Sequence, residues 1–385
     1  MDRIRERVSQ QRNSAMLVHC QRDGLLSACQ LVGAAVAVRT TKPILTHIKA
    51  IAQDDSLTLM GTDLKVGIRY QLRGVKVEQS GEAILSVTKL ISILRESGDA
   101  EVTIDADERR CSVMTSSSTF KMPSENPADF PDIATFSNVK FHELSAGILR
   151  QMIRRTTFAA GKDNARFAIT GILWEVDDGK ARLVATDTKR LALATGIADV
   201  PADLDLKGQS HLVPTKAMAL LERTLADGDD GQLIQVCLRQ NDVLFQTEKS
   251  LICSRLVEGR YPPWRDIIPK KHSARISLVV DTFLNAVRQA AIMTDDESKR
   301  VIFRFAPGKL TLEAQGATTG ESRVEMKLDD YSGPEIVINF DPAFTTEMLR
   351  VLDGSQVITL DLLDGQRPAL FRVGDDYQYL VMPLA

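Results

Sequence analysis

The chain has 385 residues, which at roughly 100–200 residues per domain predicts two to four domains. Hydrophobic residues make up 44% and charged residues 26%, as in folded, water-soluble proteins, while aromatic residues at 5% disfavour a base-stacking surface for single-stranded nucleic acid. The net charge of −3, from 48 Lys and Arg against 51 Asp and Glu, argues against nucleic-acid binding through bulk positive charge.

Residues 1–15 read as a polar extension in which arginines alternate with acidic and Gln residues, without the apolar core of a signal peptide. The apolar run over residues 31–38 is far shorter than the roughly 20 residues of a membrane-spanning helix. The five cysteines lie far apart and include no Cys-x-x-Cys pair, which indicates a reducing compartment. We therefore expect a cytoplasmic protein without a membrane partner.

A repeat of about 125 residues runs along the chain. Each copy is expected to start with an amphipathic helix, over residues 23–38, 145–160 and 281–294, opened at the capping position by Asp23, Ser145 and Asp281. A strand pair around a short polar turn follows, starting at Leu57, Ala181 and Lys309. Then come a second helix, from Val87, Pro214 and Asp341, and a β-hairpin, from Glu101, Leu233 and Val357.

This order predicts an α+β fold of three repeated domains, each with two helices and about eight strands in antiparallel sheets. Pro and charged residues replace the apolar periodicity near residues 137–138 and 270–273. The expected parts are the extension over 1–15 and domains over 16–138, 139–272 and 273–385.

Catalytic motifs are missing from the sequence. The five histidines are scattered, the acidic stretch 227–231 lacks the spacing of a calcium loop, and no phosphate-binding Gly-rich loop or nucleophile elbow is present. We therefore predict a protein that is not an enzyme and has neither a metal site nor a cofactor. The helix bodies are mainly basic, which fits a DNA-facing surface and a solvated helix face about equally.

Four motifs in the repeated segments carry a family resemblance. They are Gly61-Thr-Asp-Leu64, Val184-Ala-Thr-Asp187 with Arg190-Leu-Ala192, Leu256-Val-Glu-Gly-Arg-Tyr-Pro262 with Ile267-Ile-Pro269, and Tyr379-Leu-Val-Met-Pro383. In this order they are similar to motifs of the bacterial replicative sliding clamps, the beta subunits of DNA polymerase III. The resemblance covers about residues 16–385.

The resemblance implies a head-to-tail homodimer of three clamp domains per subunit, closed as a ring around duplex DNA with helices toward the hole. Such a ring binds without reading sequence and tolerates a slightly negative net charge, because topology holds the DNA. The DNA contacts that it implies fall at Arg39, Lys162, Arg166 and Phe167. The alternative is that Arg166 and Phe167 only pack a turn.

The resemblance also implies a cleft between the second and third domains that binds a short apolar peptide of the polymerase and other clients. The matching positions are Ile169, Thr186, Arg190, Leu191, Pro262, Ile267, Leu380, Met382, Pro383 and Leu384. Ring closure is expected to join Phe120 and Met122 of one subunit to Ile292 and Met293 of the other. Both apolar sets could instead be core residues of their domains.

The expected partners are duplex DNA, the replicative polymerase alpha subunit, an ATP-driven clamp loader, repair polymerases and other proteins with a clamp-binding motif, and a second copy of the chain. Thr188 and Lys189 stand where Gly-His is common in the family, and Asp266 replaces a frequently basic residue. These departures leave open a divergent clamp paralogue that serves repair or replaces the main clamp. A hydrolytic enzyme on the same scaffold would need an acid–base constellation that the sequence lacks.

Overall fold

The computed structural model describes residues 16–162, 167–226, 228–295, 299–316 and 318–384. The chain divides into two compact units. Unit 1 comprises Met1–Phe141, Leu220–Gly228 and Leu233–Arg255, and unit 2 comprises His142–Ala219, Asp229–Gln232 and Leu256–Ala385. Each unit is a mixture of helices and antiparallel sheets, as the α+β prediction requires.

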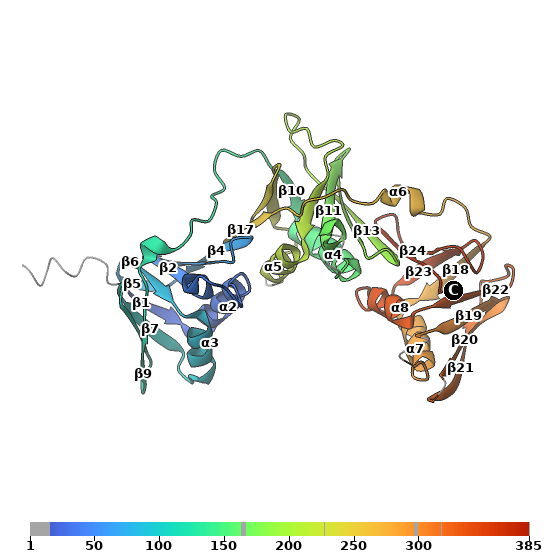
Figure 1. Cartoon of the computed structure of the whole chain (residues 1–385), viewed down its shortest axis with the longest axis horizontal. Coiled ribbons are helices and arrows are strands. Elements are labelled where there is room, and N and C mark those ends of the chain that lie inside the picture. The colour runs from blue at the N-terminus through green and yellow to red at the C-terminus, as the bar shows by residue number, and fades with distance from the viewer. Residues whose placement is uncertain (1–15, 163–166, 227, 296–298, 317, 385) are drawn as a thin grey trace, which may run out of the picture. The chain divides into compact units, whose positions relative to one another are not determined.

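From residue 16 on, the described first third of the chain contains two α-helices and nine strands. They are β1 (Met16–Gln21), α2 (Arg22–Gly33), β2 (Ile48–Gln53), β3 (Ser56–Thr62), β4 (Val66–Arg73), β5 (Lys76–Gln79), β6 (Gly81–Leu85), α3 (Val87–Glu96), β7 (Glu101–Ala106), β8 (Arg110–Met114) and β9 (Thr119–Pro123). Helices α2 and α3 lie side by side, and α2 packs on β3 and β4 (Figure 1). One sheet has the strand order β5-β1-β7-β8-β9.

The middle third repeats this order of elements. It contains β10 (His142–Ser145), α4 (Ala146–Thr156), β11 (Gly171–Asp177), β12 (Lys180–Thr186), β13 (Arg190–Ile197), β14 (His211–Pro214), α5 (Thr215–Leu225), β15 (Leu233–Leu238), β16 (Asp242–Gln246) and β17 (Ser250–Arg255). Within unit 1, the hairpins β15-β16-β17 and β4-β3-β2-β6 form one continuous run of paired strands.

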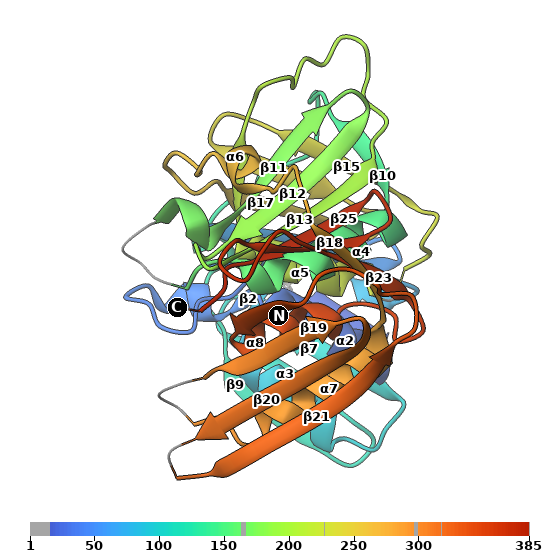
Figure 2. The ribbon, with the colours of Figure 1, turned by 90° about the vertical axis from the view of Figure 1, so that its right-hand side faces the viewer.

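The last third contains the third copy. Its elements are the one-turn helix α6 (Trp264–Ile267), β18 (Ala274–Val279), α7 (Val280–Ala291), β19 (Val301–Ala306), β20 (Gly308–Gly316), β21 (Gly320–Leu328), β22 (Ile336–Phe340), α8 (Pro342–Leu349), β23 (Val357–Leu362), β24 (Ala369–Val373) and β25 (Tyr377–Val381). Figure 2 shows β19, β20 and β21 side by side, with α7 behind them. The two sheets of unit 2 have the orders β14-β11-β12-β13-β25-β24-β23-β18 and β21-β20-β19-β22.

The first helix of each copy buries one apolar face, as the periodicity predicts. In α2 the buried side chains are Leu25, Ala28, Cys29 and Val32, spaced three and four residues apart. The helices are shorter than expected, because α2 ends at Gly33 and α7 at Ala291. In α4 the last turn tightens into the 3-10 turn Thr157–Ala159.

Two of the three predicted helix caps are wrong. The residue before α2 is Gln21 and the residue before α7 is Val279, and neither side chain caps its helix. Asp23 and Asp281 lie in the first turn instead, where a carboxylate is favourable beside the helix N-terminus without accepting the capping hydrogen bond. Ser145 does cap α4, accepting a hydrogen bond from the Ile148 amide.

The repeat extends to the hydrogen bonds of single turns. Between β3 and β4, the Thr62 hydroxyl donates to the Val66 carbonyl, and the Asp63 carboxylate accepts from the amides of Lys65 and Val66. Between β12 and β13, Thr186 and Asp187 make the same bonds with the residues that follow them. Asp187 thus orients a turn, as its counterpart in the first copy does.

The edges of the sheets follow one rule in each copy. Two strands of each copy lie at an edge when only the strands of that copy are considered. One is the second strand of the hairpin with the polar turn (β4, β13 or β21), and the other is the last strand of the copy (β9, β17 or β25). Two such edges are paired across copies: β4 with β17, from Tyr70 opposite Ser250, and β13 with β25, from Leu191 opposite Leu380. Strands β9 and β21 end their sheets without a further strand among the described residues.

No helix in the described part of the chain has the length and apolar character required to cross a bilayer. All five cysteines are free thiols, and four of them are buried. Burial raises the pKa of Cys20 and of Cys111 to about 12, so these thiols stay protonated at neutral pH.

Candidate functional site

Arg190 is the centre of a polar site with several partners in unit 2. It opens β13, and its side chain is only 6% exposed. Its guanidinium donates to Asp187 (Nε to Oδ2, 3.0 Å), to Glu347 on α8 (Nη1 to Oε2, 2.5 Å) and to the Phe158 carbonyl (2.9 Å). Its hydrogen-bonding capacity is therefore largely satisfied by fixed partners, and it ties β13 to helix α8.

Aromatic rings enclose the same guanidinium. The Arg190 carbon Cζ lies 4.6 Å from the ring centre of Phe344 and 5.4 Å from that of Phe158. Burial by itself lowers the pKa of Arg190, but Tyr379 and Glu347 outweigh it and hold this pKa above its ordinary value. Arg190 therefore stays charged at any pH at which the protein is folded.

The C-terminal segment runs directly beside this site. Strand β25 pairs with β13, placing Leu380 opposite Leu191. Beyond β25, the Met382 amide donates to the Lys189 carbonyl (2.8 Å), and the Leu384 amide donates to the Asn339 carbonyl (2.9 Å). The apolar chain end is thus held by backbone hydrogen bonds to the turn that precedes Arg190 and to β22.

An apolar cluster lies on the sheet face next to the chain end. Its buried members are Leu173, Val184, Leu191, Leu193, Leu212, Trp264, Leu370 and Leu380. The segment that connects β17 to β18 covers it, through Tyr261 and Ile268 on either side of Trp264. The Tyr261 hydroxyl donates to the Val184 carbonyl (3.1 Å), which anchors this segment to β12.

The structure brings several of the predicted cleft residues together on β12, β13 and β25, and the predicted set as a whole has mixed burial. Ile169, Thr186, Arg190, Leu191 and Leu380 are buried, and Leu191 and Leu380 belong to the apolar cluster. Pro262, Pro383 and Leu384 are half-buried. Ile267 and Met382 are the exposed members, at 46% and 41%. Ile267 and Met382 are therefore the members of this set that solvent reaches most.

Sequence reasoning missed three residues of this site: Phe158, Phe344 and Glu347. Phe344 and Glu347 are three residues apart on α8 and so share a face of that helix, which was a usable signal. What could not be seen is that this face meets Arg190, because 157 residues separate Glu347 from its partner.

The predicted DNA-contact residues are only partly described. Arg39 is exposed in the segment after α2, next to Val38 at 94% exposure, and Lys162 is exposed after α4. Phe167 begins the 3-10 turn Phe167–Thr170. Arg166 lies outside the described residues.

The predicted dimer residues lie on β9 or near β21, two strands that each end a sheet among the described residues. Phe120 (41% exposed) and Met122 belong to β9. Ile292 (70% exposed) and Met293 follow α7. The Thr319 hydroxyl donates to the Met293 carbonyl, and the Ser322 hydroxyl in β21 donates to the Ala290 carbonyl, each at 2.8 Å. Each predicted pair thus sits beside an open edge.

One basic helix residue away from this site has structural partners. Arg155 of α4, one of the basic helix residues, is buried, donates to Asp376 (3.1 Å) and lies over the Tyr377 ring. Within the described ranges, no three His, Cys, Asp or Glu side chains gather at metal-binding distances.

Comparison with known proteins gives a consistent result. Models of the N-terminal, central and C-terminal domains of the DNA polymerase III beta subunit match residues 16–134, 143–263 and 265–385. The beta sliding clamp of Pseudomonas putida is 29% identical over 94% of this chain and 98% of its own length, and that of Chlamydia pneumoniae is 27% identical over 94% and 97%. The crystal structure of the Bacillus subtilis DNA polymerase sliding clamp superposes with a TM-score of 0.88 at 26% identity, covering 97% of this chain and all of that one.

Three repeated α+β domains, joined edge to edge through their sheets, define a DNA clamp. The three domain models follow one another in order and together span nearly all of the chain after the first 15 residues. The chain belongs to the DNA polymerase III beta subunit family and is a DNA sliding clamp of that polymerase.

Proposed function

We propose that two copies of this chain close head to tail into a ring, with β21 of each copy paired to β9 of the other. The main support is the way in which sheet edges of successive copies pair within the chain. The β4–β17 and β13–β25 pairs use two of the three equivalent combinations, and a second copy supplies the third. A heterologous contact that repeats twice and pairs β9 and β21 of both copies closes a ring when the rotation between the copies fits.

The side chains at these edges support the same assembly. Phe120 and Met122 on β9 and Ile292 and Met293 beside β21 offer apolar surface where the strands would meet. Exposed apolar side chains next to an unpaired strand are a typical sign of a protein interface and a liability in an isolated monomer.

The ring would encircle duplex DNA and confer processivity on the replicative polymerase without catalysing a reaction. Arg39, Lys162, Arg166 and Phe167 would contact the DNA backbone, which carries no sequence information. Such contacts can remain few, because topology and not affinity retains the DNA. The protein would act in the cytoplasm on the nucleoid, and a separate ATP-driven loader would open the ring.

Client proteins would dock beside Arg190. The exposed Ile267 and Met382, with Pro262, Pro383 and Leu384 at the rim, offer apolar anchors for the short peptide of the polymerase alpha subunit, repair polymerases and other clients. The fixed Arg190 network and the hydrogen-bonded chain end would keep this surface preformed, which lowers the entropic cost of binding.

A divergent paralogue that serves repair or replaces the main clamp remains the second candidate. Thr188 has a backbone φ of 79°, in the region that favours glycine, and Lys189 beside it is exposed along the chain end. Asp266 is exposed on the covering segment. These residues border the client site, so they would alter client preference more than ring formation.

Retention on circular DNA tests the clamp function. The purified protein is loaded onto nicked circular DNA by a cognate loader, and its retention at moderate salt is followed before and after the DNA is linearised. We expect retention on circles and loss from linear ends. Equal loss from both, with a loader that is active on a control clamp, would refute topological linkage.

Removal of residues 382–385 tests the client site. The cut must follow β25, because Tyr379, Leu380 and Val381 are buried and pair with β13 and β24. The truncated protein is expected to lose binding of a fluorescent alpha-subunit peptide while its sedimentation stays that of the wild type. Unchanged peptide affinity would refute the assignment of the chain end to the cleft.

A further inference from the structure

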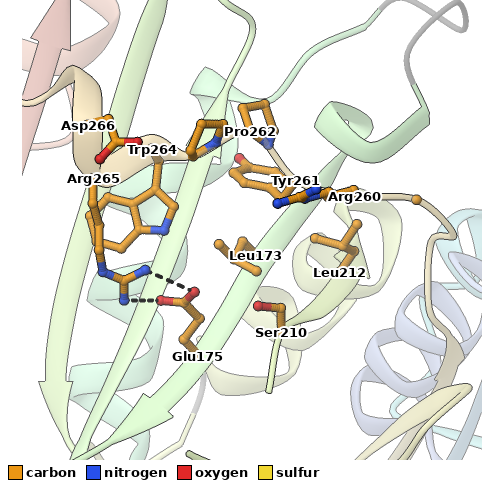
Figure 3. Close-up of a pocket in the computed structure, with 12 residues that line it drawn as sticks. Leu173, Glu175, Ser210, Leu212, Arg260, Tyr261, Pro262, Trp264, Arg265 and Asp266 are labelled. Carbon is orange, nitrogen blue, oxygen red and sulfur yellow. Dashed lines mark hydrogen bonds and ion pairs between the residues drawn. The ribbon is translucent and has the colours of Figure 1, made fainter. Parts of the chain in front are cut away.

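A second pocket lies beside the proposed client cleft, on the same segment that covers the apolar cluster. It has a volume of about 530 Å³, within the range of ligand-binding pockets. We call it the Trp264 pocket and define it by Leu173, Glu175, Leu212, Arg260, Tyr261 and Trp264. Figure 3 shows Trp264 and Tyr261 facing Leu173 and Leu212 across the pocket.

The Trp264 indole N–H is an unused donor in this pocket. Trp264 is only 6% exposed, and its Nε1 is buried with no hydrogen-bond partner among the described residues. The nitrogen lies on the side of the ring that faces Leu173 (Figure 3). A buried donor without an acceptor is unfavourable, so an acceptor brought by a ligand would gain more than an ordinary surface hydrogen bond.

The Trp264 ring is held in place from one side. The Arg265 guanidinium lies over it, with Cζ 4.2 Å from the ring centre. Arg265 also makes a two-point ion pair with Glu175 of β11, at 2.6 and 3.3 Å. The donor is thus part of a preformed wall, which is what a specific site requires.

Charge is arranged at the two ends of the pocket. The Glu175–Arg265 pair is internally neutral, while Arg260 and Asp266 have no ion-pair partner in the described part of the chain. They lie toward opposite sides of the pocket in Figure 3. An apolar floor, one N–H donor and opposite charges at the ends suit an extended peptide. A nucleic-acid strand would be repelled by Asp266 and would find only one free cation.

We propose that the Trp264 pocket binds the residues that flank the clamp-binding motif of client proteins. The flank would place an apolar side chain over Leu173 and Leu212, a backbone carbonyl against the Trp264 indole N–H, and an acidic side chain toward Arg260. This inference rests on the proposed client cleft, to which the pocket is joined through Pro262, a residue of both.

Two peptides of the replicative polymerase alpha subunit from the same organism test the proposal. Overlapping segments of the subunit are tested, and the shortest segment that binds is the core peptide. The extended peptide is the core peptide with its native flanking residues. We expect the extended peptide to bind at least about tenfold more tightly, as one further anchor with a hydrogen bond provides. Trp264→Phe, which keeps the ring but removes the donor, and Arg260→Ala should remove most of this gain without affecting the core peptide.

The indole N–H signals give a direct readout, because the chain has only two tryptophans and Trp174 is fully buried in the core. In the ¹⁵N-labelled protein, the Trp264 signal is assigned by its loss in Trp264→Phe. It should shift when the extended peptide is added and should not shift when the core peptide is added. The Trp174 signal is the internal control.

The outcomes separate this proposal from the client cleft. Equal affinities for the two peptides with an unmoved Trp264 signal would overturn the pocket and leave the cleft intact. Met382→Ala should weaken both peptides alike if the cleft is correct. If no segment of the alpha subunit binds, the cleft is overturned and this inference with it.

Discussion

At the scale of single residues, the site is organised by buried groups whose partners come from distant parts of the chain. Arg190 is the main example: a turn carboxylate, a helix carboxylate, a backbone carbonyl and two rings converge on it. Because Asp187 and Glu347 are less buried than Arg190, their side chains can still reach water when the arginine is removed. The cost of losing it is therefore moderate.

Arg190→Ala is expected to lower the melting temperature by about 4–8 °C, corresponding to roughly 2 kcal/mol for charged hydrogen bonds in a domain of this size. Arg304→Ala, which removes an exposed ion pair with Glu335, is the control and should change it by less than about 2 °C. Thermal unfolding of the two variants measures the difference. Equal, small effects would mean that the Arg190 network contributes little to stability.

His142 gives the protein a pH-dependent stability. It is fully buried against Trp174, and burial, with a smaller effect of His211, lowers its pKa to about 4. In the unfolded chain it binds a proton near pH 6.5, so between pH 6.5 and 4 the unfolded state takes up a proton that the folded state does not. Stability should therefore fall by about 3 kcal/mol as the pH drops through this window.

His142→Phe should flatten this part of the profile, because the variant keeps an aromatic ring beside Trp174 and has no group to protonate. Melting temperatures from pH 7 to 4 measure it, with His272→Phe on the exposed linker as the control. Parallel curves for wild type and His142→Phe would show that other groups cause the acid sensitivity.

At the scale of elements, helix α8 connects the chain end to the Arg190 site. It begins with Pro342 after Asp341, whose carboxylate accepts from the Ala343 amide at 2.9 Å. The helix then carries Phe344 and Glu347 to Arg190, and the Phe344 carbonyl accepts from the Tyr379 hydroxyl in β25. A change at the start of α8 should thus also affect the residues of the client site.

Asp341→Ala should cost about 1 kcal/mol, or about 2–4 °C in melting temperature, because the first turn of α8 loses its capping acceptor. Asp341→Asn keeps an acceptor at the same place and should retain most of the stability. If both variants melt at the same lowered temperature, the negative charge and not the cap would account for the stabilisation.

At the scale of the whole molecule, the proposed ring depends on the contact between β9 and β21 of different copies. Changing Ile292 and Met293 together to Ala should shift the sedimentation of the dimer toward monomer at low concentration, because exposed apolar contact area is lost there. Ile197→Ala is a matched control: this isoleucine is 74% exposed at the end of β13, a strand in neither the sheet of β9 nor that of β21. Unchanged sedimentation of the double variant would remove Ile292 and Met293 from the interface.

The part of the fold that was predicted came mostly from the local pattern of apolar and polar residues. Apolar spacing located the helices α2, α3, α4, α5, α7 and α8 and the hairpins, and their recurrence indicated three domains. Helix ends were missed by several residues, since α2 stops at Gly33 although apolar residues continue to Val38. The Asp23 and Asp281 caps were wrong because a carboxylate in the first turn and one at the cap look alike in a sequence.

By itself, the sequence determined the element types, the threefold repeat and the family, because these depend on residue spacing and on motifs that are local. Only the tertiary structure decided which edges are paired and which are open, that Glu347 and Phe344 complete the Arg190 site, and that Trp264 holds an unused donor in a pocket. Such contacts join segments far apart in the chain, and they exist only once the sheets have packed.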